Sequence, residues 1–225
     1  MAAHHIGRLA GWGLGCVAAP ILLRSMFGRG WASIGVLLGM LATIWLLILL
    51  PRAAHRAFEA GRYAKAARRY RFIGAISFTA RRDRAALLSR AGCDVAAGRP
   101  AAAEALLATI DPAVLDTTER VVWLNNRACV ALDTGRDAAT ALGWVEEATS
   151  LRPDVPAIQH TRARALLAAG RIDEAISVFE SMRAGGELSP RLEAERCRDL
   201  AAAWDHKGHA DYAADYRERA RLHAS

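Results

Sequence analysis

Apolar and polar residues follow two different patterns along this chain. Residues 31–50, WASIGVLLGMLATIWLLILL, form a run of twenty residues without a charged side chain. A helix of about twenty apolar residues is long enough to cross the hydrocarbon core of a bilayer. The run therefore predicts a transmembrane helix. After residue 51, charged residues are frequent and apolar residues recur at helical spacing.

A second uncharged stretch, residues 9–23, precedes this run. It is only fifteen residues long, and three glycines and one proline interrupt it. A short first span that forms a hairpin with the second span, an interfacial segment and an uncleaved signal-like region all remain open for it. We expect residues 1–50 to form a membrane anchor with one or two spans.

Glycine recurs at regular intervals through the rest of the chain. The intervals are 37, 37, 35 and 38 residues, and the glycines are Gly61, Gly98, Gly135, Gly170 and Gly208. An alanine follows each of them, with a further position on the same helical face four residues later. These alanines are Ala66, Ala103, Ala141, Ala175 and Ala213. Periods of this length are typical of arrays of helical hairpins.

The residue types at these positions have a local physical explanation. Glycine ends a helix in the left-handed conformation without side-chain strain, and alanine lets two antiparallel helices approach closely. Prolines mark expected helix starts, with Asp111 and Ser189 as candidate N-caps. These prolines are Pro100, Pro112, Pro156 and Pro190. We predict an all-α chain in which residues 51–225 form about ten helices, paired into five hairpins.

This pattern resembles the tetratricopeptide repeat (TPR) family over about residues 52–223. The fourth unit matches best, because Gly170, Ala175 and Phe179 have the family spacing and Pro153 precedes them. Most first helices lack the large aromatic residue that the family has near their start. The resemblance implies a TPR-like α-solenoid that serves as a protein-interaction scaffold, with its first helices lining a concave groove.

Alignment on the glycines predicts which side chains face this groove. The candidate partner-binding residues are Asn125, Asn126, His160, Arg164, Arg198 and Asp199, and Ser89 is a further inward position. Asn126 resembles an asparagine that grips the terminal carboxylate of a chaperone tail in some family members. Leu88 and Gly92 replace its expected companions, so this carboxylate clamp is incomplete. We expect the groove to hold an extended segment of a partner protein, with Arg164 and Arg198 able to attract acidic segments.

Charge is unevenly distributed along the chain, whose net charge is +7. The stretch 52–90 holds eleven Lys or Arg against two acidic residues, whereas residues 91–225 hold sixteen against twenty-one. No base-reading motif accompanies the basic stretch, which disfavours nucleic acid as a partner. Basic residues that flank a span are retained in the cytoplasm. We therefore expect an integral membrane protein with a cytoplasmic repeat domain. The alternative is a periplasm-facing TPR subunit that assists protein folding, secretion or envelope assembly.

The sequence offers little support for an enzyme. It contains no glycine-rich phosphate loop, no His-Glu-x-x-His motif and no nucleophile elbow. His206 and His209 lie near Asp205 and Asp211, but an exposed turn between helices has the same composition without a metal. The four cysteines are scattered, without a Cys-x-x-Cys pair. We expect no catalytic residue, no metal site and no cofactor.

Overall fold

The computed structural model describes residues 18, 21, 25 and 29–223. Within these residues, all regular structure is helical. Of the uncharged stretch 9–23, only Ala18 and Ile21 are described. Our expectation for that stretch therefore lies outside the described residues.

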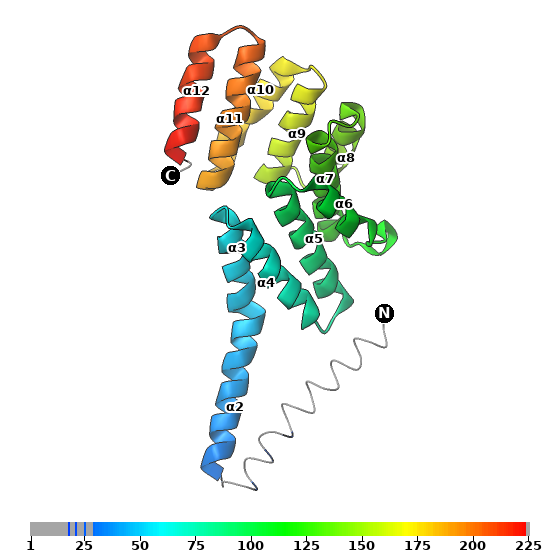
Figure 1. Cartoon of the computed structure of the whole chain (residues 1–225), viewed down its shortest axis with the longest axis vertical. Helices are drawn as coiled ribbons and strands as arrows, with labels where there is room; N and C mark the ends of the chain where they lie inside the picture. The colour runs from blue at the N-terminus through cyan, green and yellow to red at the C-terminus, as the bar shows by residue number, and fades with distance from the viewer. Residues whose placement is uncertain (1–17, 19–20, 22–24, 26–28, 224–225) are drawn as a thin grey trace.

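The apolar run forms one long helix that continues into the first repeat. Helix α2 (Arg29–Ile44), a π-helical turn (Trp45–Leu49) and α3 (Leu50–Glu59) follow one another without a break (Figure 1). Pro51 lies in the first turn of α3 and has no N–H to donate. Just before it, the N–H of Leu50 donates to the carbonyl of Trp45, five residues back. The boundary that we expected after residue 50 thus falls inside a continuous helix.

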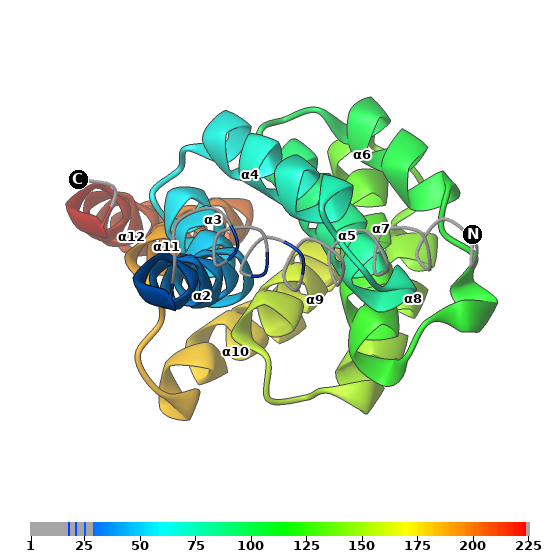
Figure 2. The same cartoon turned by 90° about the horizontal axis from the view of Figure 1, so that it is seen from below.

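The helices from α3 onward pair into five antiparallel hairpins. The hairpins are α3 with α4 (Tyr63–Ala75), α5 (Ala80–Ala96) with α6 (Pro100–Ala108), α7 (Thr117–Asp133) with α8 (Ala138–Leu151), α9 (Pro156–Ala168) with α10 (Ile172–Ser181), and α11 (Pro190–His206) with α12 (Ala210–His223). Successive hairpins pack on one another and form a curved array (Figures 1 and 2).

The five recurring glycines all have the backbone conformation that their spacing predicts. Their φ angles lie between +65° and +77°, in the left-handed region that favours glycine. After α9, for example, the N–H of Gly170 donates to the carbonyl of Leu167, and that of Arg171 donates to the carbonyl of Leu166. These bonds satisfy carbonyls that the end of a helix leaves without partners. The predicted hairpin turns are confirmed.

The five recurring alanines are fully buried, as their spacing predicts. Each of them is 0% exposed. The side chain four residues later is also buried in the second, third and fourth hairpins, at Leu107, Val145 and Phe179. In the last hairpin this position is Arg217, which is exposed and pairs with Asp205. No further hairpin covers it within the described residues.

One predicted helix start is wrong. Pro100, Pro156 and Pro190 do begin helices, but Pro112 begins only a short 3-10 turn, Pro112–Val114. Helix α7 begins later because Asp116 and Glu119 form a capping box: Asp116 accepts the N–H of Glu119 at 2.9 Å, and Glu119 accepts the N–H of Asp116 at 3.1 Å. This reciprocal pair satisfies two N–H groups that would otherwise lack partners.

The apolar end of the long helix contributes to the core of the first hairpin. Leu50 and Ala54 pack with Ile73 of α4 and Ala86 of α5, and Leu46 covers this cluster. The preceding apolar side chains remain uncovered: Leu38 is 60% exposed and Met40 is 58% exposed. Among the described residues, one helix, Ser33–Glu59, is long and apolar enough to cross a membrane.

Candidate partner-binding groove

The inner surface of the array encloses a hollow of about 360 Å³ between α5, α7, α9 and α11. All six residues that the sequence predicts for partner binding line it: Asn125, Asn126, His160, Arg164, Arg198 and Asp199. Ser89 is not part of the lining, and its hydroxyl donates to the carbonyl of Ala85. The glycine spacing thus identifies which residues meet, while their binding role stays a prediction.

Asn126 serves the packing of two repeats. Its side chain is 6% exposed, and Nδ2 donates to the carbonyl of Leu88 at 3.0 Å. Gly92 lies beside it: a Cβ at that position would be 3.5 Å from Asn126 Oδ1, an ordinary van der Waals contact. Asn126 therefore connects α7 to α5. The neighbouring Asn125 differs, since its buried Oδ1 has no hydrogen-bond partner among the described residues.

A line of alternating charges crosses the floor of the groove. Asp199 Oδ2 of α11 lies 3.0 Å from His160 Nε2 and 3.9 Å from Arg164 Nε, both on α9. Arg164 Nη2 in turn donates to Asp133 Oδ1 of α7 at 2.8 Å. Three successive repeats are thus joined by ionic contacts. Arg164 already has acidic partners, so its charge is less available to a ligand than the sequence alone suggests.

Among the arginines that line the groove, Arg198 is the one with an exposed side chain and no acidic partner within the described residues. Its side chain is exposed, and Nε donates only to the carbonyl of Ala194, at 3.3 Å. It forms no ion pair with another described residue. The lining as a whole balances three acidic and three basic side chains: Asp133, Glu195 and Asp199 against Arg164, Arg191 and Arg198. The lining is therefore not the net basic surface that Arg164 and Arg198 alone would form.

The first and last hairpins meet at one side of the groove. Arg191, in the first turn of α11, lies with Cζ 4.7 Å from the ring centroid of Phe58 and with Nε 3.5 Å from Glu59 Oε2. Both residues belong to the end of α3, which approaches the start of α11 in Figure 1. Burial, with Glu195 nearby, raises the pKa of Tyr63 at the same contact. This contact was not predictable from the repeat pattern, which relates each unit only to its neighbours.

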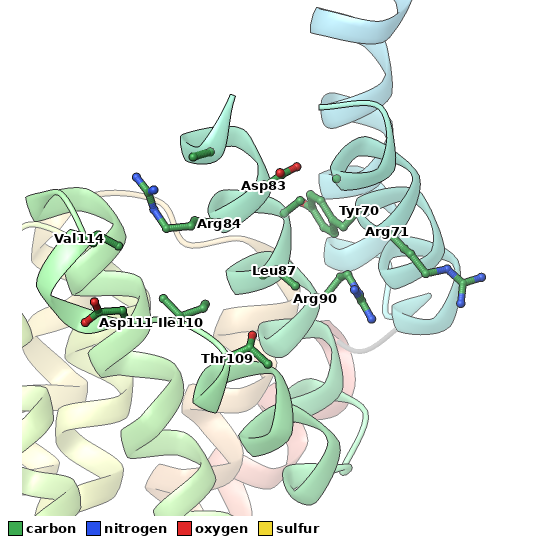
Figure 3. Close-up of a pocket in the computed structure, with 13 residues that line it drawn as sticks. Tyr70, Arg71, Asp83, Arg84, Leu87, Arg90, Thr109, Ile110, Asp111 and Val114 are labelled. Carbon is green, nitrogen blue, oxygen red and sulfur yellow. The ribbon is translucent and has the colours of Figure 1, made fainter. Parts of the chain in front are cut away.

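A second hollow, of about 550 Å³, lies outside the groove between α4, α5 and the segment after α6. Figure 3 shows Leu87 and Arg90 of α5 between Tyr70 of α4 and Ile110 beyond α6. Burial raises the pKa of Tyr70 to about 12. Sequence analysis missed this hollow because none of its residues occupies an inward position of the repeat.

Neither hollow brings together an evident catalytic set. Cys129 lines the groove, but burial raises the pKa of its thiol and keeps it in the unreactive protonated form. At the turn after α11, the ring of His209 packs against Trp204 and Tyr212. No group of three His, Cys, Asp or Glu residues is placed to hold a metal ion within the described part of the chain.

Comparisons with known proteins add little to this description. No protein-family model matches the chain, and no curated protein matches it. One solved structure that is similar in fold is titled "MamA MSR-1 C2". It shares 17% sequence identity with a TM-score of 0.43, over 80% of this chain and 95% of that one. A likeness of this degree identifies neither a function nor a partner.

Proposed function

We propose that this protein is a membrane-anchored, TPR-type scaffold that holds a segment of a partner protein in its concave groove. The observation that carries the proposal is the set of six polar side chains that three consecutive repeats bring to one hollow. Two of them have unused hydrogen-bonding or ionic capacity: Asn125 Oδ1 has no donor and Arg198 has no acidic partner among the described residues.

The exposed apolar helix supports the anchor. Large apolar side chains cover its surface, and apart from Leu46, which packs on the first hairpin, each is 43–60% exposed from Ile34 to Leu49. Contiguous exposed apolar area on this scale is costly in water and marks an interaction with a membrane or another protein. The length of the run matches the hydrocarbon thickness of a bilayer. Trp45, which is 48% exposed, is of the residue type that is enriched at membrane–water interfaces.

The groove chemistry indicates what kind of segment it would hold. Asn125 Oδ1 requires an N–H or O–H donor, and Arg198 favours a carboxylate or a carbonyl oxygen. An extended peptide offers both kinds of group along its backbone. Because the ends of the array meet at Arg191, only a short stretch of peptide fits within the groove itself.

A photo-crosslinking residue introduced in the native host tests this use of the groove. Ala157 of α9 is exposed and lines the groove, whereas Ala168 of the same helix is exposed and lies outside it. We expect adducts of defined mass from a crosslinker at position 157 and none from position 168. Arg198→Glu should abolish the adducts, and Arg183→Glu, at an exposed arginine outside the groove, should preserve them. Equal adducts from the two alanine positions would exclude the groove as the binding site.

The side of the membrane needs a separate experiment. The excess of basic residues after the apolar run favours a cytoplasmic repeat array. A reporter fused after Ser225 that works only in the cytoplasm should therefore be active. Activity only of a reporter that works outside the cytoplasm would instead support the periplasm-facing alternative.

A further inference from the structure

The turn between α4 and α5 lies beside the apolar part of the long helix. Helix α4 runs antiparallel to α3, and three contacts fix its register: Ala66 packs near Ala57, Arg69 Nη1 donates to the carbonyl of Ala53 at 2.6 Å, and Ile73 packs on Leu50. The end of α4 therefore lies level with residues 46–50. In Figure 1, α4 slants away from the long helix, and its turn to α5 lies to the side of that helix, at the end of α4 nearer to α2.

This level coincides with the edge of the proposed bilayer span. Residues 46–50 end the uncharged run, and the headgroup layer extends about 5–7 Å beyond the hydrocarbon core on each side. Residues after Ile73 continue past Leu50 in the direction of Trp45. A bilayer that surrounds the apolar helix thus has its headgroups at the turn.

We propose that the α4–α5 corner, residues 71–82, rests on the headgroups of anionic phospholipids and forms a second contact with the bilayer that the long helix crosses. This inference depends on the proposed membrane anchor. Two features of the corner support it: its charge and its exposed apolar side chains.

The corner is strongly basic. Residues 71–82 contain three arginines, Arg71, Arg81 and Arg82, and no acidic residue. Arg81 pairs with Asp116 and Arg84 pairs with Glu119, both at the start of the third hairpin. These ion pairs reduce the positive charge that the two arginines present to a membrane surface. Arg71 and Arg82, which flank the turn, form no ion pair with another described residue. The negative surface potential of anionic lipids attracts basic groups at this height.

Apolar side chains accompany these charges. Arg68, Arg71, Phe72 and Ala75 occupy one exposed face of α4 at helical spacing, and Phe72 is 46% exposed. Ile76 and Phe78 are partly exposed in the turn itself. An aromatic ring between cations suits the boundary between headgroups and acyl chains. The ring can contact the acyl chains there while the basic groups contact the hydrated headgroups.

The second hollow adjoins the corner, because Gly74 and Ala80 form part of its lining. Its lining also includes Arg71 and Arg90, neither of which is ion-paired within the described residues. A phosphate that approaches the corner thus has cationic partners both on the exposed face and in the hollow.

Fluorescence quenching in vesicles tests the proposal on the full chain. A Cys16→Ser variant is labelled with an environment-sensitive fluorophore at Ala75→Cys or, as a control, at Ala64→Cys. Both alanines are exposed and lie on α4, about 16 Å apart along its axis. The vesicles contain either phosphatidylcholine alone or phosphatidylcholine with phosphatidylglycerol, and each carries a headgroup-level spin-labelled lipid as quencher.

We expect quenching at position 75 and little at position 64, with the stronger effect in phosphatidylglycerol vesicles. Reversing Arg71 and Arg82 together, to Glu, should remove most of the additional quenching that phosphatidylglycerol causes. The matched reversal of Arg62 and Lys65, which are exposed at the far end of α4, should preserve it.

Three results would overturn the inference in distinguishable ways. Absence of quenching at position 75, in a protein that stays in the vesicles after a high-salt wash, would reject the corner contact and leave the anchor intact. Quenching that is equal in the two kinds of vesicle would reject anionic lipid as the partner. Release of the protein by the wash would reject the anchor itself, and the corner contact with it.

Discussion

Glu59 Oε2 and Arg191 Nε lie 3.5 Å apart, although the two residues belong to the first and the last hairpin. An array of stacked hairpins normally leaves its ends apart, because each repeat contacts only its neighbours. Here the curvature brings the ends together, and Arg191 also lies over the ring of Phe58. Access to the groove on this side therefore depends on a contact between side chains.

We predict that Glu59→Gln widens the groove without unfolding the chain. The substitution removes the cross-groove charge pair but leaves Arg191 bonded to Glu195 on its own helix. Since both partners are partly exposed, the loss of stability should be no more than about 1 kcal/mol. Spin labels at Ala60→Cys and Glu187→Cys, in a Cys16→Ser variant, should report a longer and broader distance distribution by pulsed electron paramagnetic resonance.

The matched control is Glu195→Gln, which removes only the pair within α11. That variant should keep the wild-type distance distribution. The reverse outcome, with Glu195→Gln as the variant that separates the labels, would show that Glu59 does not hold the ends of the array together.

We predict that the pair Glu193–Arg196 is the ion pair most sensitive to substitution. Arg196 is 2% exposed, bonds both carboxylate oxygens of Glu193 at 2.6 and 2.7 Å, and donates to the carbonyl of Phe179. Glu193→Gln leaves a buried guanidinium without its counter-charge and should cost about 3–5 kcal/mol. Denaturant unfolding of the detergent-solubilised chain measures this loss.

A double variant separates the charge effect from packing. Glu193→Leu combined with Arg196→Met removes both charges, and we expect it to recover most of the stability that the single variant loses. A double variant as unstable as Glu193→Gln would show that the pair contributes through shape rather than charge.

The same pair predicts how stability depends on pH. Hydrogen bonds from Arg196 hold the pKa of Glu193 below its ordinary value. Its contribution to the free energy of unfolding is therefore complete above an unfolded-state pKa of about 4.3 and is lost as the pH falls through the lower folded-state pKa. The free energies of unfolding of the wild type and Glu193→Gln should approach each other as the pH falls from 7 to about 3. The reason is that acid neutralises the carboxylate in both the folded and the unfolded wild type. A difference in the free energy of unfolding that stays constant over this pH range would contradict the assignment of the pH dependence to Glu193.

Ala175→Leu should destabilise the fourth hairpin. Ala175 is 0% exposed between α9 and α10, so three additional carbon atoms have no space and should cost about 1–3 kcal/mol. Ala168→Leu adds the same atoms at an exposed position of α9 and should change stability little. Thermal unfolding of the two variants, followed by circular dichroism, compares them directly; equal midpoints would contradict close packing at this turn.

Two neighbouring leucines should differ sharply in their effect on the first hairpin. Leu50 is 7% exposed in the cluster with Ile73 and Ala86, whereas Leu49 is 45% exposed. Leu50→Ala should therefore cost about 2–5 kcal/mol, and Leu49→Ala should leave the hairpin intact. Protease sensitivity of α4 in the vesicle-bound chain gives the readout. Equal sensitivity would mean that the long helix and the first repeat do not share a core.

The sequence predicts the local features of this fold well. Glycine at a helix end and alanine at a close contact depend on steric limits that act within a few residues, so Gly170 and Ala175 were identifiable from spacing alone. The same spacing identifies six residues of the groove lining but misplaces Ser89, since the first helices of the repeats have similar rather than identical positions. The start of a helix is harder to predict where two residue types that favour it lie close together. Pro112 and Asp116 both favour a helix start, and α7 begins after the capping box at Asp116.

Long-range relationships were not predictable from the repeat. The bond from Asn126 to the carbonyl of Leu88 depends on the exact approach of α7 to α5. The meeting of Glu59 and Arg191 depends on curvature summed over five hairpins. Small differences in the packing angle of each hairpin accumulate over the array, and no single residue specifies their total.

The unbroken helix from α2 into α3 has a mechanical consequence. A flexible linker would let a tethered domain search a wide volume for its partner. With the proposed membrane anchor, the continuous helix would instead hold the array at one height and one angle, so that a segment bound in the groove would lie at a fixed distance from the bilayer. Rotation of the continuous helix about its own axis would rotate the whole array by the same angle.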